Sequence, residues 1–172
     1  MSCEEEQDTR HYRGQGFGFG PVRNEEIVMA GFSEQDFVAG QLQKKAFPGK
    51  IIKNGNFSLA RLGYTTKEDF EKNVIEPKRN STPITKVGRA NVGEIRKLMV
   101  PLHWEKPTRD IRSVCVIDKV EEGDHDGHAA LKYCEEQKGF TQNQLDRLRA
   151  HIAADLVHLF ENTSDLDRAF AN

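Results

Sequence analysis

The sequence predicts a single α/β domain, or an α+β one, with a mixed sheet of four or five strands and a long amphipathic helix at its C-terminal end. Three observations support this fold class. The chain has 172 residues, of which 37% are hydrophobic, which suits one domain with a substantial core. Short apolar runs alternate with segments of helical periodicity. The C-terminal segment carries the most regular amphipathic pattern in the chain.

Residues 1–22 are predicted to form a flexible N-terminal tail ahead of a domain that comprises residues 23–172. Residues 13–21 alternate glycine with other residues, so the backbone entropy is high and little apolar surface can be buried. No strand is predicted before Gly14, so a phosphate-binding loop between a strand and a helix is not expected. The Arg and Phe side chains of the tail leave contact with single-stranded nucleic acid as an alternative.

The first part of the domain is predicted to alternate strands and helices. Residues 27–32 form an apolar run typical of a buried strand, and Ser33 is expected to cap a helix that continues to about Phe47. Asn54-Gly55 is a two-residue turn signal between apolar runs, so we expect a β-hairpin whose second strand covers residues 57–62.

Two capped helices and another strand are expected in the middle of the domain. Thr66 and Asp69 are spaced as a capping box and start a short helix. Residues 84–87 are a strand candidate, and Asn91 is expected to cap the helix that follows it.

The C-terminal part contains the strongest local signals. Residues 114–117 form a continuous apolar run with β-branched side chains, as is typical of a central strand buried on both faces. A helix is expected over residues 128–137. Thr141 and Gln144 form a capping box for a final helix. Its apolar stripe recurs at three- and four-residue spacing and comprises Leu145, Leu148, Ile152, Leu156 and Leu159.

The formal net charge of -2 conceals a strong asymmetry along the chain. Residues 41–100, here called the basic segment, hold 13 basic and 5 acidic residues. Residues 1–40 hold 3 basic and 8 acidic residues, and residues 113–172 hold 6 and 12. Either the basic segment binds an anionic partner, or the acidic parts of the chain face it within the fold. The candidate anion-binding residues are Lys44, Lys45, Lys50, Lys53, Arg61 and Arg96.

Composition also bears on where the protein acts. No apolar run approaches the ~18 residues of a membrane-spanning helix, and the N-terminus is acidic rather than basic and apolar. We therefore expect no membrane partner. The three cysteines, Cys3, Cys115 and Cys134, cannot all pair within one chain, which favours a reduced compartment and a cytoplasmic location.

The densest group of polar residues that could carry chemistry follows the strand at 114–117. Asp118, Asp124, Asp126 and His128 are candidate ligands for a divalent metal ion, and His125 is a candidate general base. No established metal-binding spacing is matched. The alternative interpretation is that Asp126 caps the helix expected from residue 128, and that Asp124 and His125 are solvated.

Two further groups of residues are candidate sites. His151, Asp155 and His158 share one side of the final helix and form either part of a metal site or polar residues bordering the apolar stripe. Cys134 could pair with a histidine as a nucleophile, but burial in apolar surroundings makes a thiol inert.

Residues 56–62 read Asn-Phe-Ser-Leu-Ala-Arg-Leu, and residues 66–70 read Thr-Lys-Glu-Asp-Phe; His128-Ala129 comes later. This order resembles small uncharacterised bacterial α/β proteins with an FSL…TxExF…HA pattern, which are associated with defence or mobile-element neighbourhoods. The resemblance covers roughly residues 45–131. It implies no particular activity, and it draws attention to Arg61, Arg96 and His128.

The function predicted from these observations is that of a non-enzymatic accessory or interaction protein of a bacterial cytoplasmic system. Its basic segment would bind an anionic partner, either a protein or a nucleic acid, without a cofactor. The alternative is a metal-dependent phosphoester hydrolase, which would use the cluster around Asp118 and His128 and a divalent metal ion. The sequence leaves the oligomeric state open.

Overall fold

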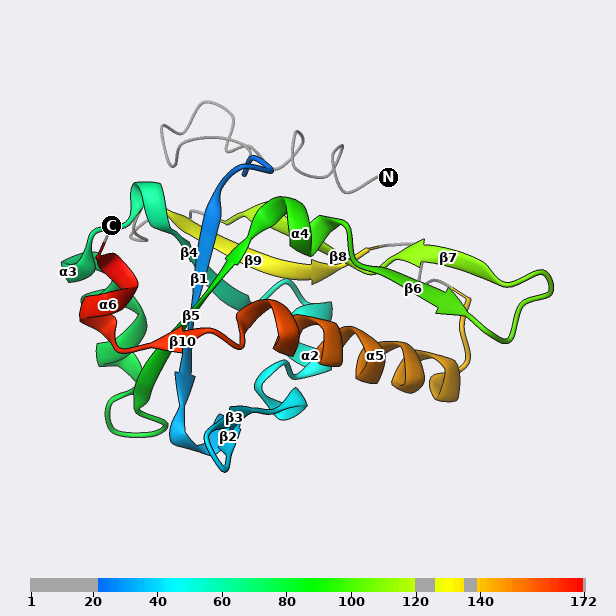
Figure 1. Ribbon diagram of the computed structural model, residues 1–172, viewed down its shortest axis with the longest axis horizontal. Helices are drawn as coiled ribbons and strands as arrows, with labels where there is room; N and C mark the ends of the chain where they lie inside the picture. Colours follow the sequence, from blue (N-terminus) through cyan, green and yellow to red (C-terminus); the bar gives the residue numbers. More distant parts are fainter. Residues whose placement is uncertain (1–21, 120–125, 135–138, 172) are drawn as a thin grey trace.

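The computed structural model describes residues 22–119, 126–134 and 139–171. Its largest element is a six-stranded sheet in the order β10-β5-β1-β4-β9-β8, in which every described pair of neighbours is antiparallel (Figure 1). Its strands are β1 (Ile27–Ser33), β4 (Phe57–Arg61), β5 (Ile84–Asn91), β8 (Val114–Asp118), β9 (His128–Tyr133) and β10 (Thr163–Ser164).

Two small hairpins accompany the sheet: β2 (Phe37–Val38) with β3 (Gln41–Leu42), and β6 (Met99–Leu102) with β7 (Arg109–Arg112). The β6–β7 hairpin projects from one end of the molecule (Figure 1). The helices are α2 (Gly49–Lys53), α3 (Lys67–Phe70), α4 (Val92–Arg96), α5 (Gln142–Phe160) and α6 (Leu166–Phe170). Short helical turns are η1 (Glu34–Asp36), η2 (Lys44–Ala46), η3 (Leu62–Tyr64), η4 (Glu71–Ile75) and η5 (Glu76–Lys78).

Helices cover both faces of the sheet. On one face, α5 packs its buried stripe on residues of β1, β4, β8 and β9 that include Phe32, Leu59, Val116 and Leu131. On the other face, α3, η4 and α6 cover Met29, Ala60 and Val87. Gly88 of β5 allows α5 to end close to the sheet, because a Cβ there would lie 2.8 Å from the Phe160 carbonyl oxygen.

The predicted fold class is confirmed, as are several of its elements. The strands at β1, β4, β5 and β8 are present, and α5 is a helix of 19 residues. The capping boxes at Thr66 and Thr141 form as expected, and the Asn91 side chain accepts a hydrogen bond from the Glu94 amide. Local capping chemistry therefore predicts three helix starts correctly.

The sheet itself differs from the predicted one. It has six strands and antiparallel pairings throughout the described part, where a mixed sheet of four or five was expected. Strand β8 lies at its edge rather than at its centre. All five β8 residues are nevertheless buried, because α4 packs beside this edge and its Arg96 side chain donates a hydrogen bond to the Val116 carbonyl oxygen.

The helix expected between Ser33 and Phe47 is wrong. After η1, the chain turns through Ala39 and Gly40, which have φ values of +48° and +77°, and forms the β2–β3 hairpin. These left-handed conformations are incompatible with a continuous helix.

The hairpin expected at Asn54-Gly55 is also wrong. Residues before this dipeptide form α2, and Gly55, at a φ of +65°, follows the end of that helix. Asn-Gly suits a helix C-terminus as well as a hairpin turn, because both require left-handed backbone.

The helix expected over residues 128–137 is wrong in its described part, which is strand β9 up to Tyr133. This strand pairs with β4 on one side and β8 on the other, and Ala129, Ala130 and Leu131 are fully buried. Tertiary pairing here overrides the helical preference of Ala and Leu. Asp126 consequently does not cap a helix.

Candidate functional site

Four of the predicted anion-binding residues lie on two consecutive short segments. Lys44 and Lys45 belong to η2, and Lys50 and Lys53 belong to α2; all four side chains are exposed. We call these four residues the lysine surface. Within residues 22–119, 126–134 and 139–171, no carboxylate forms an ion pair with any of them.

The lysine surface has a rigid base, because each of its two segments is anchored in the core. Phe47, which follows η2, is 2% exposed, and Ile52 of α2 is completely buried. The Phe47 ring packs between Phe32 of β1 and Phe57 of β4, at centroid distances of 5.7 and 5.3 Å. The backbone that carries the lysines is therefore fixed to the sheet by buried side chains.

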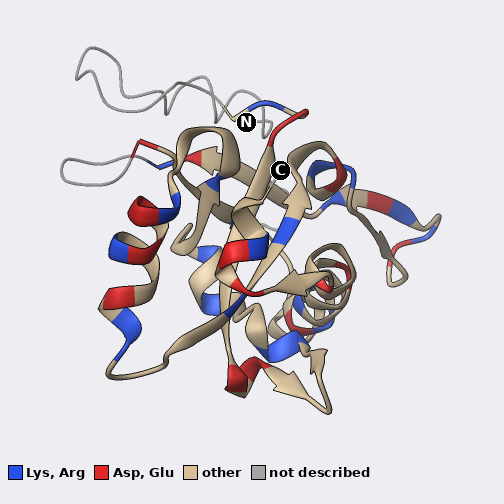
Figure 2. Cartoon of the chain, turned by 60° about the vertical axis from the view of Figure 1, so that its left-hand side comes forward, with Lys and Arg blue, Asp and Glu red and all other residues tan. Residues whose placement is uncertain are grey.

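Other lysines of the basic segment are paired with the acidic C-terminal end of the chain. Lys86 of β5 lies 2.6 Å from Asp165, and Lys67 of α3 pairs with Asp167. The hydrogen bond from Lys86 lowers the pKa of the Asp165 carboxyl, and the bond to Asp167 raises the pKa of Lys67. Figure 2 shows basic and acidic residues intermixed along much of the ribbon. Part of the basic segment is thus neutralised within the fold.

Arg61, another predicted anion-binding residue, is only 1% exposed and pairs with carboxylates inside the protein. Its guanidinium donates two hydrogen bonds to Glu26, of 2.7 and 2.8 Å, and lies 3.5 Å from an Asp118 oxygen. It also lies 4.4 Å from the centre of the Tyr64 ring. Burial of a cation is favourable only with such compensation, so the Arg61 ion-pair cluster (Arg61, Glu26 and Asp118) is part of the core.

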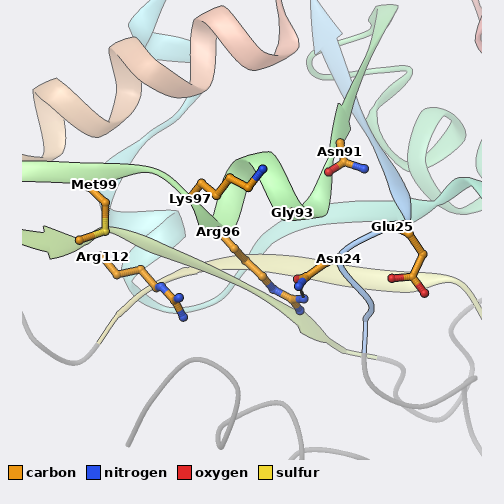
Figure 3. A pocket seen from close by; sticks show the side chains of 8 residues that line it. All are labelled: Asn24, Glu25, Asn91, Gly93, Arg96, Lys97, Met99 and Arg112. Atoms are coloured by element: carbon orange, nitrogen blue, oxygen red, sulfur yellow. Dashed lines mark hydrogen bonds between the residues drawn. The ribbon is translucent and has the colours of Figure 1, made fainter.

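Arg96 is 8% exposed and lines a pocket of about 650 Å³ (Figure 3). Its guanidinium donates to the Asn24 side chain and to the carbonyl oxygens of Val22 and Val116, at 2.6 and 3.2 Å for the carbonyls. Lys97, which also lines the pocket, donates to Glu94. The polar side chains that line the pocket are Asn24, Glu25, Asn91, Arg96, Lys97 and Arg112.

This pocket could receive an anionic group, because it contains three cations and one carboxylate. Two of the three cations, Arg96 and Lys97, already donate hydrogen bonds to acceptors of the protein itself. A ligand would have to compete with those acceptors. The lysine surface faces no such competition from the described residues, so it is the stronger candidate for anion binding.

The structure does not bring the described members of the predicted metal site together. Asp118 pairs with Ala129 across β8 and β9, so its side chain lies on the opposite face of the sheet from that of His128. The His128 Nε2 atom lies 3.3 Å from the Ser58 hydroxyl. Asp124 and His125 lie outside the described residues. Among the residues described, no three His, Cys, Asp or Glu side chains are grouped as metal ligands.

The second histidine group forms local pairs along α5 and just beyond it. The His151 Nε2 lies 3.6 Å from Asp155, and the His158 Nδ1 lies 3.6 Å from Glu161. His151 and His158 are both exposed. These pairs agree with the interpretation of polar residues at the border of the apolar stripe.

The described cysteines lie together on one face of the sheet. The Cys134 sulfur lies 3.1 Å from the Cys115 sulfur. Both side chains are buried.

A second pocket, of about 210 Å³, was not expected from the sequence. It lies between the ends of β1 and β4, and Gly31, Phe32, Phe57 and Ser58 contribute to its walls. We call it the strand-gap pocket. The only local signal for it is Gly31 in the middle of an apolar strand, since glycine inside a strand often marks a close approach or an irregularity.

The fold and these surfaces define the chain as an antiparallel α/β protein with an exposed cationic surface and a buried ion-pair cluster. Comparisons with models of protein families, with curated proteins and with solved structures found no match. None of the described helices is both long and apolar enough to cross a membrane.

Proposed function

We propose that this protein is a non-enzymatic interaction protein that binds an anionic partner through the lysine surface. The observation that carries the proposal is the contrast within the basic segment. Lys67 and Lys86 are paired with C-terminal carboxylates, whereas the four residues of the lysine surface are exposed and have no such pair among the described residues. In line with the resemblance of its sequence, the protein would act as an accessory component of a bacterial cytoplasmic system.

The physical basis is electrostatic attraction by four exposed lysines that fall within ten positions of the chain. Flexible exposed lysines bind anions as point charges, with little geometric selectivity and with an affinity that falls steeply as salt rises. The buried anchors Phe47 and Ile52 keep the two segments in place, so binding requires ordering of the side chains but not of the backbone. This arrangement provides attraction to an anionic chain without any chemical step.

Charge reversal tests the proposal. The variant carries four Lys→Glu changes, at Lys44, Lys45, Lys50 and Lys53. The matched control reverses four exposed cations on other elements, at Lys72, Arg79, Lys106 and Arg147. Both variants change the net charge equally. Binding to a fluorescent acidic peptide and to a single-stranded DNA of about 20 nucleotides is measured by anisotropy across a salt series.

We expect the lysine-surface variant to lose at least about tenfold in affinity for the better of the two probes, and the control to lose about threefold or less. The salt dependence should become shallower in the lysine-surface variant alone. Circular dichroism and thermal unfolding show whether both variants stay folded. Equal losses in the two variants would indicate attraction by net charge only, and would overturn the assignment of this surface.

A further inference from the structure

We infer that the strand-gap pocket receives an apolar side chain of the partner, and that the partner is therefore an extended acidic polypeptide segment. This inference rests on the proposed function, because the lysine surface would supply most of the attraction. It adds the class of partner, which the lysines alone leave undecided between protein and nucleic acid.

The pocket opens where the ladder between β1 and β4 stops. These two strands pair only at Val28 with Arg61 and at Met29 with Ala60. Continued pairing would place Gly31 opposite Ser58 and Phe32 opposite Phe57. Instead, these four residues line the pocket, while β1 continues to pair with β5 and β4 with β9. One edge of each strand thus faces the gap.

A buried aromatic side chain packs against one residue of each strand beside the gap. The Phe47 ring lies between Phe32 and Phe57, stacks on the latter and meets the former edge to face. Phe160 of α5 packs against Phe47 at 5.6 Å. Phe47 is itself buried, so a closer approach of Phe32 and Phe57 would require this group of rings to repack.

The lining combines apolar and polar groups and includes two cations. Phe32, Ile51, Phe57 and Val74 provide apolar surface, and Ile51 is one of the few large apolar side chains that are strongly exposed, at 42%. Two lysines, Lys45 of η2 and Lys78 of η5, border it on different elements. Lys45 belongs to the lysine surface, so the pocket and that surface are continuous.

One carboxylate also lies at the pocket, but it is already engaged. An Asp36 oxygen accepts hydrogen bonds from the Ser33 amide and hydroxyl, at 2.8 and 3.0 Å. These hydrogen bonds hold the carboxylate at the start of η1, and the two lysines outnumber this one carboxylate. The two lysines therefore leave the border of the pocket favourable for acidic residues on either side of an inserted apolar group.

Size and backbone chemistry favour a peptide over a nucleic acid. A volume of about 210 Å³ is below the ~300–1,000 Å³ of typical small-molecule pockets, so it suits one side chain better than a nucleotide. Strand edges offer amide and carbonyl groups that an extended peptide backbone can pair with, whereas a sugar-phosphate backbone cannot form that ladder. Acidic residues would contact the lysine surface, and an apolar residue between them would enter the pocket.

The test uses two synthetic peptides with the full-length protein. One is Glu-Asp-Glu-Phe-Glu-Asp-Glu, and the other has Ser in place of Phe. We expect the Phe peptide to bind about tenfold more tightly, which corresponds to burial of one apolar side chain. Ile51→Ser should remove most of that difference. Val38→Ser, a change of another exposed apolar residue outside the pocket, should leave it intact.

Backbone amide signals give a second readout. The Phe peptide should shift or protect the amides of Gly31 and Ser58, which line the gap, more than the Ser peptide does. Equal affinity of the two peptides, or no effect of Ile51→Ser, would overturn the pocket assignment. Tighter binding of single-stranded DNA than of the Phe peptide would overturn the choice of a polypeptide partner.

The outcomes also separate this inference from the proposed function. If charge reversal of the lysine surface weakens the binding of both peptides, and the Phe and Ser peptides bind equally, the proposal of an anionic partner is retained and the proposal for the pocket is rejected. If reversal leaves the binding of both peptides unchanged, the proposed function itself fails.

Discussion

Positive charge is buried and paired at one end of the β1–β4 strand pair, and it is exposed at the other end. At one end the strands are hydrogen-bonded, and the Arg61 side chain is buried against two carboxylates. At the other end the ladder has stopped, the Phe47 ring packs between Phe32 and Phe57, and Lys45 and Lys78 border an open pocket. All three cations belong to the same basic segment of the sequence.

This difference shows that the burial of a cationic side chain decides whether it pairs inside the fold or stays available to an external anion. A buried guanidinium must be compensated inside the fold, because desolvation of an unpaired charge costs several kcal/mol. An exposed lysine remains solvated and needs no internal partner. Arg61 therefore stabilises the junction of β1, β4 and β8, whereas the lysine surface remains accessible to an external anion.

Removal of the buried cation should have the largest effect. Arg61→Met leaves Glu26 and Asp118 without this counter-charge in a buried site, and we expect a loss of about 4 kcal/mol in the free energy of unfolding. Urea denaturation at neutral pH measures it. Arg109→Met, at an exposed ion pair of the β6–β7 hairpin, should cost less than about 1 kcal/mol. A similar small cost for Arg61→Met would show that the cluster contributes little to stability.

Replacement of Phe47, at the open end of the strand pair, should have the second-largest effect. Phe47→Ala should cost about 3 kcal/mol, because it removes a fully packed ring from the contact between Phe32 and Phe57. It should also weaken binding of the Phe peptide and alter amide exchange at Gly31. Loss of stability without any change at Gly31 would mean that Phe47 does not hold the strands apart.

Tyr133, the last residue of β9, gives a smaller effect at neutral pH and a larger one at alkaline pH. Burial raises the pKa of its phenol to about 12, and within the described residues its hydroxyl has no hydrogen-bond partner. In the unfolded chain this phenol ionises near pH 10, so the free energy of unfolding is unaffected below that pH and falls as pH rises through 12, by about 3 kcal/mol. Tyr133→Phe should remove this decline and change stability at pH 7 by less than about 1 kcal/mol, as urea denaturation at a series of pH values would show. An identical alkaline transition in the variant would assign the decline to other groups.

Sequence alone predicts the elements whose signals are local. The capping boxes at Thr66 and Thr141 require residues three positions apart, and the apolar run of β8 is contiguous. Strand β9 could not be predicted in the same way. Its residues have good helical propensity, and only pairing with β8 on one side and with β4, about 70 positions away as in the pair Ala60–His128, on the other makes it a strand.

Dependence on contacts between distant parts of the chain limits the prediction of the candidate site in the same way. The residues of the lysine surface can be predicted, because lysine is rarely buried and four of them fall within ten positions. The burial of Arg61 cannot, since it depends on Glu26 and Asp118 coming together from two other strands or their ends. The strand-gap pocket depends on where a ladder stops and on the insertion of Phe47, and neither follows from a local pattern.

The smallest expected effect concerns the ion pair between Lys86 and Asp165, which neutralises one lysine of the basic segment. The Lys86 hydrogen bond lowers the pKa of Asp165, so the pair is complete above about pH 4 and is lost as pH falls through the pKa of that carboxyl. Asp165→Asn breaks the ion pair at neutral pH and adds one uncompensated cation to β5. Because both side chains are exposed, affinity for an acidic peptide should rise by about threefold or less in low salt, and this gain should vanish at high salt.

A matched control separates this local effect from the change in net charge. Asp146→Asn on α5 removes the same charge from a residue that lies 3.9 Å from Arg149, away from β5. Asp165 makes no side-chain capping bond to α6, so its replacement by Asn leaves the start of that helix unaltered. Anisotropy titrations of both variants with the acidic peptide give the comparison. An increase of about tenfold or more for Asp165→Asn alone would mean that the acidic C-terminal end shields the basic segment more strongly than an exposed pair allows, and that its release governs binding.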